Sequence, residues 1–240
     1  MKTYQSKLKS REEVAEGTMA LHLEKPAGFQ FKAGQYLDIT LVNPPESDSQ
    51  GITRTFSIAS APYESELLVP TRIRNSAFKR VLGALPPGTE LKIEGPMGSF
   101  ILHKNHAKPA VFLAGGIGIT PFLSILRQAA EEKLPHLLYL FYSNRRPEDA
   151  AFLKHLQEFA RLNANFTFIP SMSEMGKPKL DWRGERGFID RAMLMRHSSD
   201  LQAAICYVAG PPTMVAAMRQ MLTDAGTDED AIRTEEFGGY

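Results

Sequence analysis

The amino-acid sequence predicts two domains, an N-terminal antiparallel β-barrel and a C-terminal α/β domain with a doubly wound parallel sheet. Its 240 residues, 43% of them hydrophobic, suffice for two domains of ordinary size. Short runs of alternating apolar and polar residues extend to about residue 102, and continuous apolar runs alternating with helical patterns follow. The polar segment 103–109, which ends in proline, separates the two patterns. We therefore expect the barrel in residues 1–103 and the α/β domain in residues 108–240.

In the barrel half, strand-length runs are bounded by clusters of glycine, proline, asparagine and serine. Their spacing favours a small antiparallel barrel or sandwich. The runs are residues 18–26, 35–42, 54–60, 66–74 and 89–98. Helical spacing occurs in residues 76–85, where apolar residues recur at positions 78, 81, 82 and 85.

In the second half, continuous apolar runs have the length of strands buried on both faces, and amphipathic stretches separate them. The expected strands are residues 110–115, 136–143, 165–173 and 203–210, and the expected helices are residues 121–133, 148–162 and 212–226. This alternation is typical of parallel βαβ units, which bind ligands at the carboxyl ends of their strands.

The composition excludes several classes of function. The formal net charge of +1 offers no basic field, so we expect neither nucleic acid nor a membrane as a partner. A single cysteine, Cys206, excludes a disulfide or a four-cysteine metal site within the chain, and we expect it in the core. The histidines have no metal-ligand spacing, so no metal site is expected. Because no signal-like N-terminus or run of about 20 apolar residues occurs, we expect a cytoplasmic protein.

Two glycine turns follow expected strands. The first, AGGIGITPF at residues 114–122, leads into a helix that Pro121 can begin, and its glycines leave backbone amides open to an anion. A flexible connection without a ligand is the alternative. The second, VAGPPTM at residues 208–214, has the same design. Both turns belong to the carboxyl edge of the sheet, so we expect them to share a crevice.

A third motif, RTFS at residues 54–57, lies in the barrel half. On a strand, Arg54 is suited to pair with a phosphate, Phe56 to lie against a flat ring and Ser57 to donate to a ring nitrogen. An ordinary edge strand with one surface arginine is the alternative.

Taken in order, these motifs resemble the ferredoxin–NADP reductase family. RTFS is followed by GPMGSF, GGIGITP, AGPPTM and EEF, and this series extends over nearly the entire chain. In style the chain is similar to reductase components of bacterial oxygenases, without an iron–sulfur domain. The resemblance implies that the barrel binds FAD and that the α/β domain binds NADH or NADPH.

The resemblance also implies flavin contacts along the barrel. Arg54 would bind the FAD pyrophosphate, and Ser57 would bond near flavin N5. Thr55 and Phe56 would lie along the ribityl chain and the isoalloxazine ring, although relatives usually have tyrosine at position 56. Lys79 replaces the serine or threonine that normally meets the FAD phosphates. The remaining flavin-lining positions implied are Thr71, Arg72, Ile73 and Phe78.

The two turns supply the implied nucleotide contacts. Thr120 would point from the first turn toward the flavin, and Ala209 stands where relatives often have a cysteine beside the nicotinamide. The other implied contacts are Gly116, Gly118, Gly210, Pro211 and Met214.

The C-terminus matches an acid–aromatic pair that lies beside the isoalloxazine in relatives. Glu236 and Phe237 occupy the matching positions, and either Phe237 or Tyr240 would cover the flavin face. The residues expected at the reacting atoms are Ser57, Thr120 and Phe237.

The choice between NADH and NADPH stays open. The segment after the second expected strand of the α/β domain favours the 2′-phosphate of NADPH, because it offers Ser143, Asn144, Arg145 and Arg146. Glu174, after the third, favours the 2′-hydroxyl of NADH.

The function that the resemblance implies is an FAD-dependent NAD(P)H oxidoreductase. A hydride passes from the nucleotide to flavin N5, and electrons then leave to a separate acceptor, which would be a ferredoxin, a flavodoxin, an oxygenase component or a small molecule such as free flavin. One alternative is an FAD-binding electron-transfer or regulatory subunit without independent turnover. Another is a nucleotide-binding module without flavin, which leaves RTFS unexplained. The sequence specifies neither the acceptor nor the oligomeric state.

Overall fold

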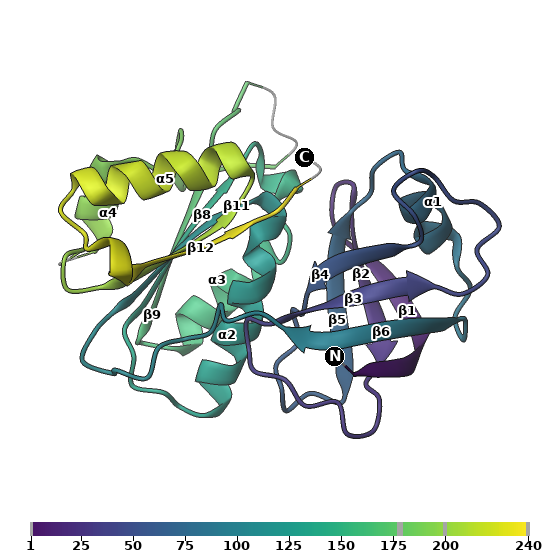
Figure 1. The fold of residues 1–240 in the computed structure, drawn as a ribbon. Helices are drawn as coiled ribbons and strands as arrows, with labels where there is room; N and C mark the ends of the chain where they lie inside the picture. Colours follow the sequence, from purple (N-terminus) through teal and green to yellow (C-terminus); the bar gives the residue numbers. More distant parts are fainter. Residues whose placement is uncertain (1, 177–179, 199–200, 239–240) are drawn as a thin grey trace.

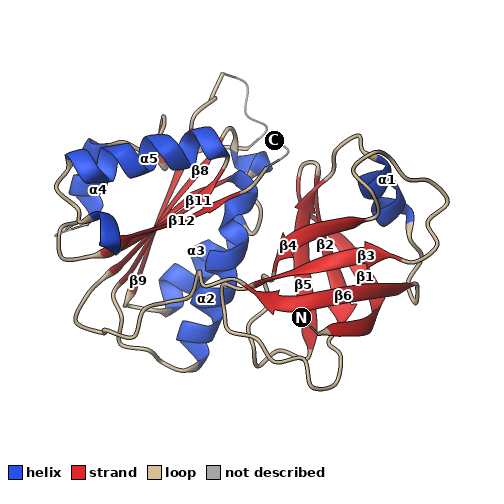
Figure 2. Cartoon of the chain, in the orientation of Figure 1, coloured by secondary structure: helices blue, strands red, loops and turns tan. Residues whose placement is uncertain are grey.

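The computed structural model describes residues 2–176, 180–198 and 201–238. Figure 1 shows two halves side by side, an all-β half and a half in which helices cover a sheet, and Figure 2 shows the same division by secondary structure. The predicted fold class, an antiparallel barrel followed by a parallel α/β domain, is confirmed.

The barrel half is a six-stranded antiparallel sheet in the order β4-β3-β6-β1-β2-β5. Its elements are β1 (Thr3–Ala15), β2 (Thr18–Glu24), β3 (Tyr36–Leu41), β4 (Thr53–Ser57), β5 (Glu66–Arg72), α1 (Ala77–Ala84) and β6 (Glu90–Met97). The predicted helix is confirmed as α1, which is capped by Ser76 and buries its apolar side, including Val81 and Leu82. The sequence did not predict β1, because only Ser6 and Leu8 of its residues are buried and no apolar alternation marks it.

The second half is a six-stranded parallel sheet in the order β10-β9-β8-β7-β11-β12. Its strands are β7 (Ala110–Gly115), β8 (Leu138–Asn144), β9 (Phe166–Met172), β10 (Glu185–Arg186), β11 (Ile205–Gly210) and β12 (Ile232–Glu236). Its α-helices are α2 (Ile119–Glu131), α3 (Leu153–Leu162), α4 (Arg191–His197) and α5 (Pro212–Asp224). Short 3₁₀ turns are η1 (Gly116–Gly118), η2 (Pro147–Asp149) and η3 (Glu229–Ala231).

Helices cover both faces of the parallel sheet, as the doubly wound prediction requires. Alternate residues of β7 enter different cores, with Phe112 packing toward α2 and α3 and Val111 toward α4 and α5. Cys206 lies fully buried in the second core, and burial raises the pKa of its thiol to about 12. The prediction that Cys206 is a core residue is therefore confirmed.

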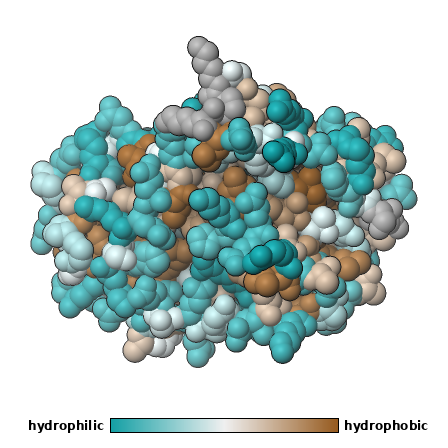
Figure 3. All heavy atoms as spheres, turned by 180° about the vertical axis from the view of Figure 1, so that it is seen from behind, coloured by the Kyte–Doolittle hydropathy of each residue, from teal (hydrophilic) through white to brown (hydrophobic). Residues whose placement is uncertain are grey.

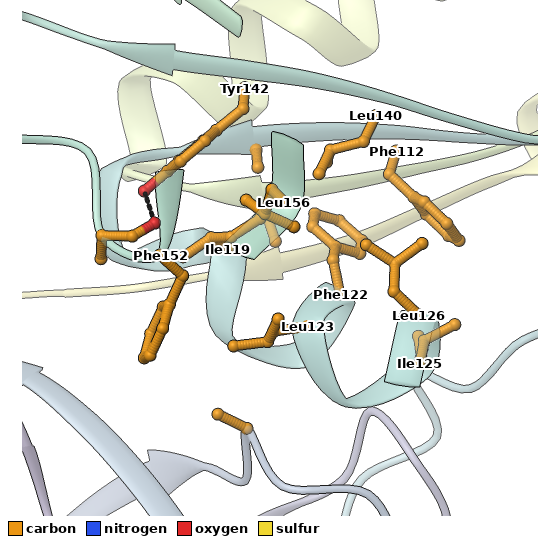
Figure 4. Packing of buried hydrophobic residues seen from close by; sticks show 14 of the residues in the cluster. Phe112, Ile119, Phe122, Leu123, Ile125, Leu126, Leu140, Tyr142, Phe152 and Leu156 are labelled. Atoms are coloured by element: carbon orange, nitrogen blue, oxygen red, sulfur yellow. Dashed lines mark hydrogen bonds between the residues drawn. The ribbon is translucent and has the colours of Figure 1, made fainter. Parts of the chain in front are cut away.

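The core on the α2 side continues into the barrel. Figure 4 shows the α2 residues Ile119, Phe122 and Leu126 gathered against the sheet, and Leu68 and Phe100 of the barrel belong to the same cluster. The Ser124 hydroxyl donates to the Ser60 carbonyl at 2.6 Å, and Arg127 pairs with Glu64 at 3.1 Å. Packing, a buried hydrogen bond and an ion pair therefore hold α2 against the barrel.

Among the described helices, none combines the length and apolarity needed to cross a bilayer. On the face seen in Figure 3, hydrophilic side chains surround smaller groups of hydrophobic ones.

Candidate active site

A cavity of about 440 Å³ lies between the barrel and the carboxyl edge of the parallel sheet. Its walls come from β4, β5, the first turn of α1, the η1–α2 turn and the segment that follows β12. Nine of the residues predicted from the sequence line it: Arg54, Thr55, Phe56, Ser57, Thr71, Arg72, Lys79, Thr120 and Phe237. Residues from both halves of the chain therefore line the same cavity.

One end of the cavity is rich in cations. Arg54 lies on β4 and donates to the carbonyls of Gln50 and Thr53 at 2.8 and 2.7 Å, and it pairs with Asp48 at 3.4 Å. The other Asp48 carboxylate oxygen accepts a hydrogen bond from the backbone of Ala77, the first residue of α1. The loop before β4 therefore holds the Arg54 guanidinium beside the N-terminus of α1.

Lys79 projects from the first turn of α1 into the same end. Its ammonium lies 4.5 Å from the centre of the Phe56 ring and contacts the Thr71 hydroxyl. Burial, and secondarily the charge of Arg54, lower the pKa of Lys79 to about 8. Beneath Lys79, the rings of Phe56 and Phe78 stack at 6.0 Å.

The part of the cavity lining formed by Ser57, Thr120 and Phe237 carries no charge. Ser57 and Thr120 are 5% and 1% exposed, and the Thr120 hydroxyl donates to the Ile117 carbonyl at 2.7 Å. The Phe237 backbone donates to the Gly210 carbonyl at 2.9 Å, which fixes the chain after β12 beside the end of β11. The barrel, the first turn and the C-terminal segment thus converge where the sequence predicted the reacting atoms.

The two glycine turns pack directly against each other. A Cβ on Gly118 would lie 2.2 Å from the Ala209 carbonyl oxygen, and one on Gly115 would lie 2.3 Å from the sulfur of Met214. Gly116 has φ of +52°, in the left-handed region that favours glycine. The two turns therefore touch each other where a crevice between them was expected, and Gly210 takes part in this contact.

A second cavity, of about 530 Å³, opens beyond β8 and β9 and shares Arg72 with the first. Arg145 pairs there with Glu174 at 3.6 Å, and both side chains are exposed. Arg146 donates to both carboxylate oxygens of Asp149 and is held in place. Of these two arginines, Arg145 is therefore the less firmly held.

Several predicted positions lie outside the first cavity. Ile73 is 43% exposed, because side chains alternate along an extended chain and Arg72 takes the inward direction. Phe78 is 1% exposed and supports Phe56 from the barrel core. Tyr240 lies outside the described residues.

The glutamate next to the predicted acid differs from it in burial. Glu236 is exposed, whereas the Glu235 carboxyl is largely buried, and its Oε2 atom has no hydrogen-bond partner. Burial raises the pKa of Glu235 to about 7. Strand alternation was the missed signal, since in a strand Glu235 shares its face with Phe237.

The residues of the first cavity fit FAD. The buried Nε of Arg72 has no hydrogen-bond partner, and Arg54, Arg74 and Lys79 provide further cations for a diphosphate. At the edge of the parallel sheet, both side-chain amide atoms of Asn144 are buried without a partner. Polar groups of this kind are normally satisfied by hydrogen bonds, so a ligand or water belongs beside each of them.

Comparison with known proteins agrees with this geometry. Residues 5–101 match the oxidoreductase FAD-binding domain, and residues 112–220 match the oxidoreductase NAD-binding domain. The structure is similar to a ferredoxin NADP⁺ reductase from Neisseria gonorrhoeae with bound FAD and NADP, with a TM-score of 0.81 and 21% identity over 98% of this chain and 99% of that one.

Several curated relatives are named as reductase components of oxygenases. The chain is 32% identical to the reductase component of propane 2-monooxygenase from Rhodococcus jostii, over 89% of this chain and 57% of that protein. It is also 32% identical to the phenol hydroxylase P5 protein of Acinetobacter pittii, over 90% of this chain and 60% of the relative. This chain thus spans about three fifths of the length of these relatives.

The fold and the matched domains define a two-domain protein, in which the barrel matches the oxidoreductase FAD-binding domain and the α/β half matches the oxidoreductase NAD-binding domain. The chain belongs to the ferredoxin–NADP reductase family, as its motifs had indicated.

Proposed function

We propose that this protein is an NAD(P)H reductase that uses FAD to pass electrons to a separate acceptor. The convergence of Ser57, Thr120 and Phe237 at one end of the cavity carries the proposal. FAD supplies the hydride-accepting and electron-donating chemistry when bound, and the chain supplies orientation and hydrogen bonds. Ser57 donates a hydrogen bond near flavin N5, and Thr120 lies where the two nucleotides meet.

The proposed cofactor contacts follow the cavity. Arg54 and Lys79 bind the phosphates of FAD, and Phe56 lies along its ring. Phe237 covers the flavin and gives way to nicotinamide. The remaining proposed contacts are Thr55, Thr71 and Arg72 for FAD, with Gly116, Gly118, Asn144, Arg145, Gly210, Pro211 and Met214 for the nucleotide. The division into residues 1–103 and 108–240 is proposed on the same basis.

The proposed acceptor is a ferredoxin, a flavodoxin or an oxygenase component. The names of the relatives support the last of these, since they are reductase components of oxygenase systems. An FAD-binding subunit without independent turnover is the alternative. A cytoplasmic location stays a prediction from the sequence.

A visible spectrum of the purified chain, recorded anaerobically before and after NADH or NADPH, tests the proposal. Bleaching of a yellow protein by either nucleotide is the expected result, and the faster nucleotide identifies the preferred one. A yellow protein that neither nucleotide bleaches would favour the passive subunit. A colourless protein that cannot be reconstituted with FAD would exclude the flavin.

Arg54→Ala tests the assigned phosphate contact. Loss of a charge-assisted bond should weaken FAD retention by about 10- to 100-fold, measured as the FAD content after gel filtration and as Kd. Arg11→Ala is the matched control, because Arg11 donates to the Leu85 carbonyl on an exposed part of the barrel. Unchanged FAD retention in Arg54→Ala would refute the assigned contact.

A further inference from the structure

Lys79 is a buried cation in a cavity that holds other cations. Its side chain lies between the Phe56 ring and the Thr71 hydroxyl, and Arg54, Arg72 and Arg74 line the same space. Among the described contacts, its partners are this hydroxyl and this ring, and neither is an anion. An ammonium without an anionic partner is costly to hold away from water.

The nearest acidic side chains are already engaged. Asp48 accepts hydrogen bonds from the Arg54 guanidinium and from the start of α1, and Glu46 pairs with Arg80 at 2.5 Å on the outer side of that helix. The cations that line the cavity therefore lack a matching set of acids from the chain. A ligand that carries about two negative charges, as a diphosphate does, would balance part of this excess of positive charge, including the charge of Lys79.

The helix adds a second attraction for an anion at this end. α1 begins at Ala77, and the residues before it, Asn75 and Ser76, line the cavity beside Lys79. The amides of Ala77 and Lys79 are engaged by Asp48 and Ser76, so this helix attracts an anion through the positive end of its dipole rather than through free amides. The diphosphate of FAD therefore has its most favourable position between Arg54, Lys79 and the start of α1.

With the FAD diphosphate beside Lys79 and Arg54, as proposed above, we propose that FAD binding draws up to one proton from solvent onto the Lys79 amine in weakly alkaline solution. The proposal rests on the proposed function, because it needs FAD in this cavity. The proton passes from the buffer to the neutral amine, and the resulting ammonium pairs with phosphate. In more acidic solution Lys79 is already charged, so binding takes up no proton.

The effect of FAD binding on the protonation of Lys79 follows from the difference between its surroundings without FAD and with FAD. Burial and Arg54 lower the pKa of Lys79 to about 8 in the protein without FAD. A neighbouring diphosphate raises it again, because the opposite charge favours the ammonium. FAD affinity is then constant below about pH 8 and falls by about tenfold at pH 9. FAD binding should therefore take up more protons per site at pH 9 than at pH 7.

Isothermal titration of apoprotein with FAD at pH 7 and pH 9, in buffers of different ionisation enthalpy, measures both Kd and proton uptake. Lys79→Met should weaken FAD binding about 10- to 100-fold at pH 7 and abolish the buffer-dependent enthalpy at pH 9. Lys79→Arg keeps the charge but does not titrate, so its Kd should be equal at the two pH values. Lys92→Met is the control, because Lys92 is exposed on β6, and it should behave as the wild type.

The outcomes separate the two proposals. Wild-type protein that binds FAD at pH 7 without proton uptake at pH 9 would overturn the role of Lys79 and leave the reductase function standing. Proton uptake that persists in Lys79→Met would also overturn it, since another group would then be responsible. Wild-type apoprotein that binds no FAD at pH 7 would contradict the proposed function itself.

Discussion

The barrel side and the α/β side of the site are built on different principles. On the barrel side, long cationic side chains line an open cavity and outnumber the acids beside them. Arg54 pairs with Asp48, whereas the described contacts of Lys79 include no acid and the Nε atom of Arg72 has no hydrogen-bond partner. On the α/β side, the two glycine turns fill each other's space, and the nearby arginines pair with acids. Charged side chains therefore form the site on the barrel side, whereas the shape of the closely packed backbone forms it on the α/β side.

This difference indicates which amino-acid substitutions each half of the site tolerates. A charge on the barrel wall can be altered while the fold remains, because the side chain borders open space. A side chain added to the glycine turns meets backbone atoms, and close-packed interiors yield little. Substitutions should therefore affect binding on the first side and stability on the second.

Gly118→Ala should give the largest effect. The new Cβ would lie 2.2 Å from the Ala209 carbonyl oxygen, a backbone atom that cannot move away freely. We expect a loss of about 3 kcal/mol in the free energy of unfolding, measured by urea denaturation. Gly83→Ala is the matched control, because its Cβ would meet nothing within 4 Å inside α1. That variant should be stabilised by about 0.5 kcal/mol. Equal stability of the two variants would contradict the close contact of the turns.

Glu235→Gln should have the next largest effect, and its sign depends on pH. Burial raises the pKa of Glu235 from 4.5 to about 7, so the wild-type fold favours the protonated carboxyl. Stability from this group is complete below about pH 4.5 and is lost as the pH rises through about 7. Glutamine is always neutral, so the stability of the variant relative to wild type should be greater at pH 8 than at pH 5 by about 2–3 kcal/mol.

Denaturation of both proteins at pH 5 and pH 8, with and without FAD, measures this difference. Glu236→Gln is the control, since Glu236 is exposed and should show no pH-dependent gain. If Glu235→Gln gained nothing at pH 8, its carboxyl would be paired in solution. The C-terminal strand would then have to be arranged differently.

These contrasts also explain what could be predicted from the sequence. The order of strands and helices was predictable wherever burial produces a regular pattern of apolar residues in the sequence, as in β7 and α2. β1 and β12 were not, because few of their residues are buried and their strand character comes from pairing with distant segments. The site residues of RTFS followed from a motif. Two features were not predicted: the contact of Asp48 with both Arg54 and the start of α1, and the burial of Glu235. The first depends on a contact between separate segments of the chain, whereas strand alternation could have indicated the second.

The smallest expected effect is on the preference for NADPH or NADH. It shows whether charged side chains contribute to nucleotide recognition on the α/β side. Glu174 pairs with Arg145 at 3.6 Å, and both side chains are largely exposed. Glu174→Gln frees Arg145 for the 2′-phosphate of NADPH, yet an exposed pair is worth at most about 1 kcal/mol. The ratio of kcat/KM for NADPH to that for NADH should therefore rise about two- to fivefold, in steady-state assays with ferricyanide. Glu229→Gln removes a similarly exposed pair with Arg219 and should leave the ratio unchanged. An unchanged ratio in Glu174→Gln would mean that backbone shape alone sets nucleotide recognition in the α/β domain, which would sharpen the contrast with the barrel.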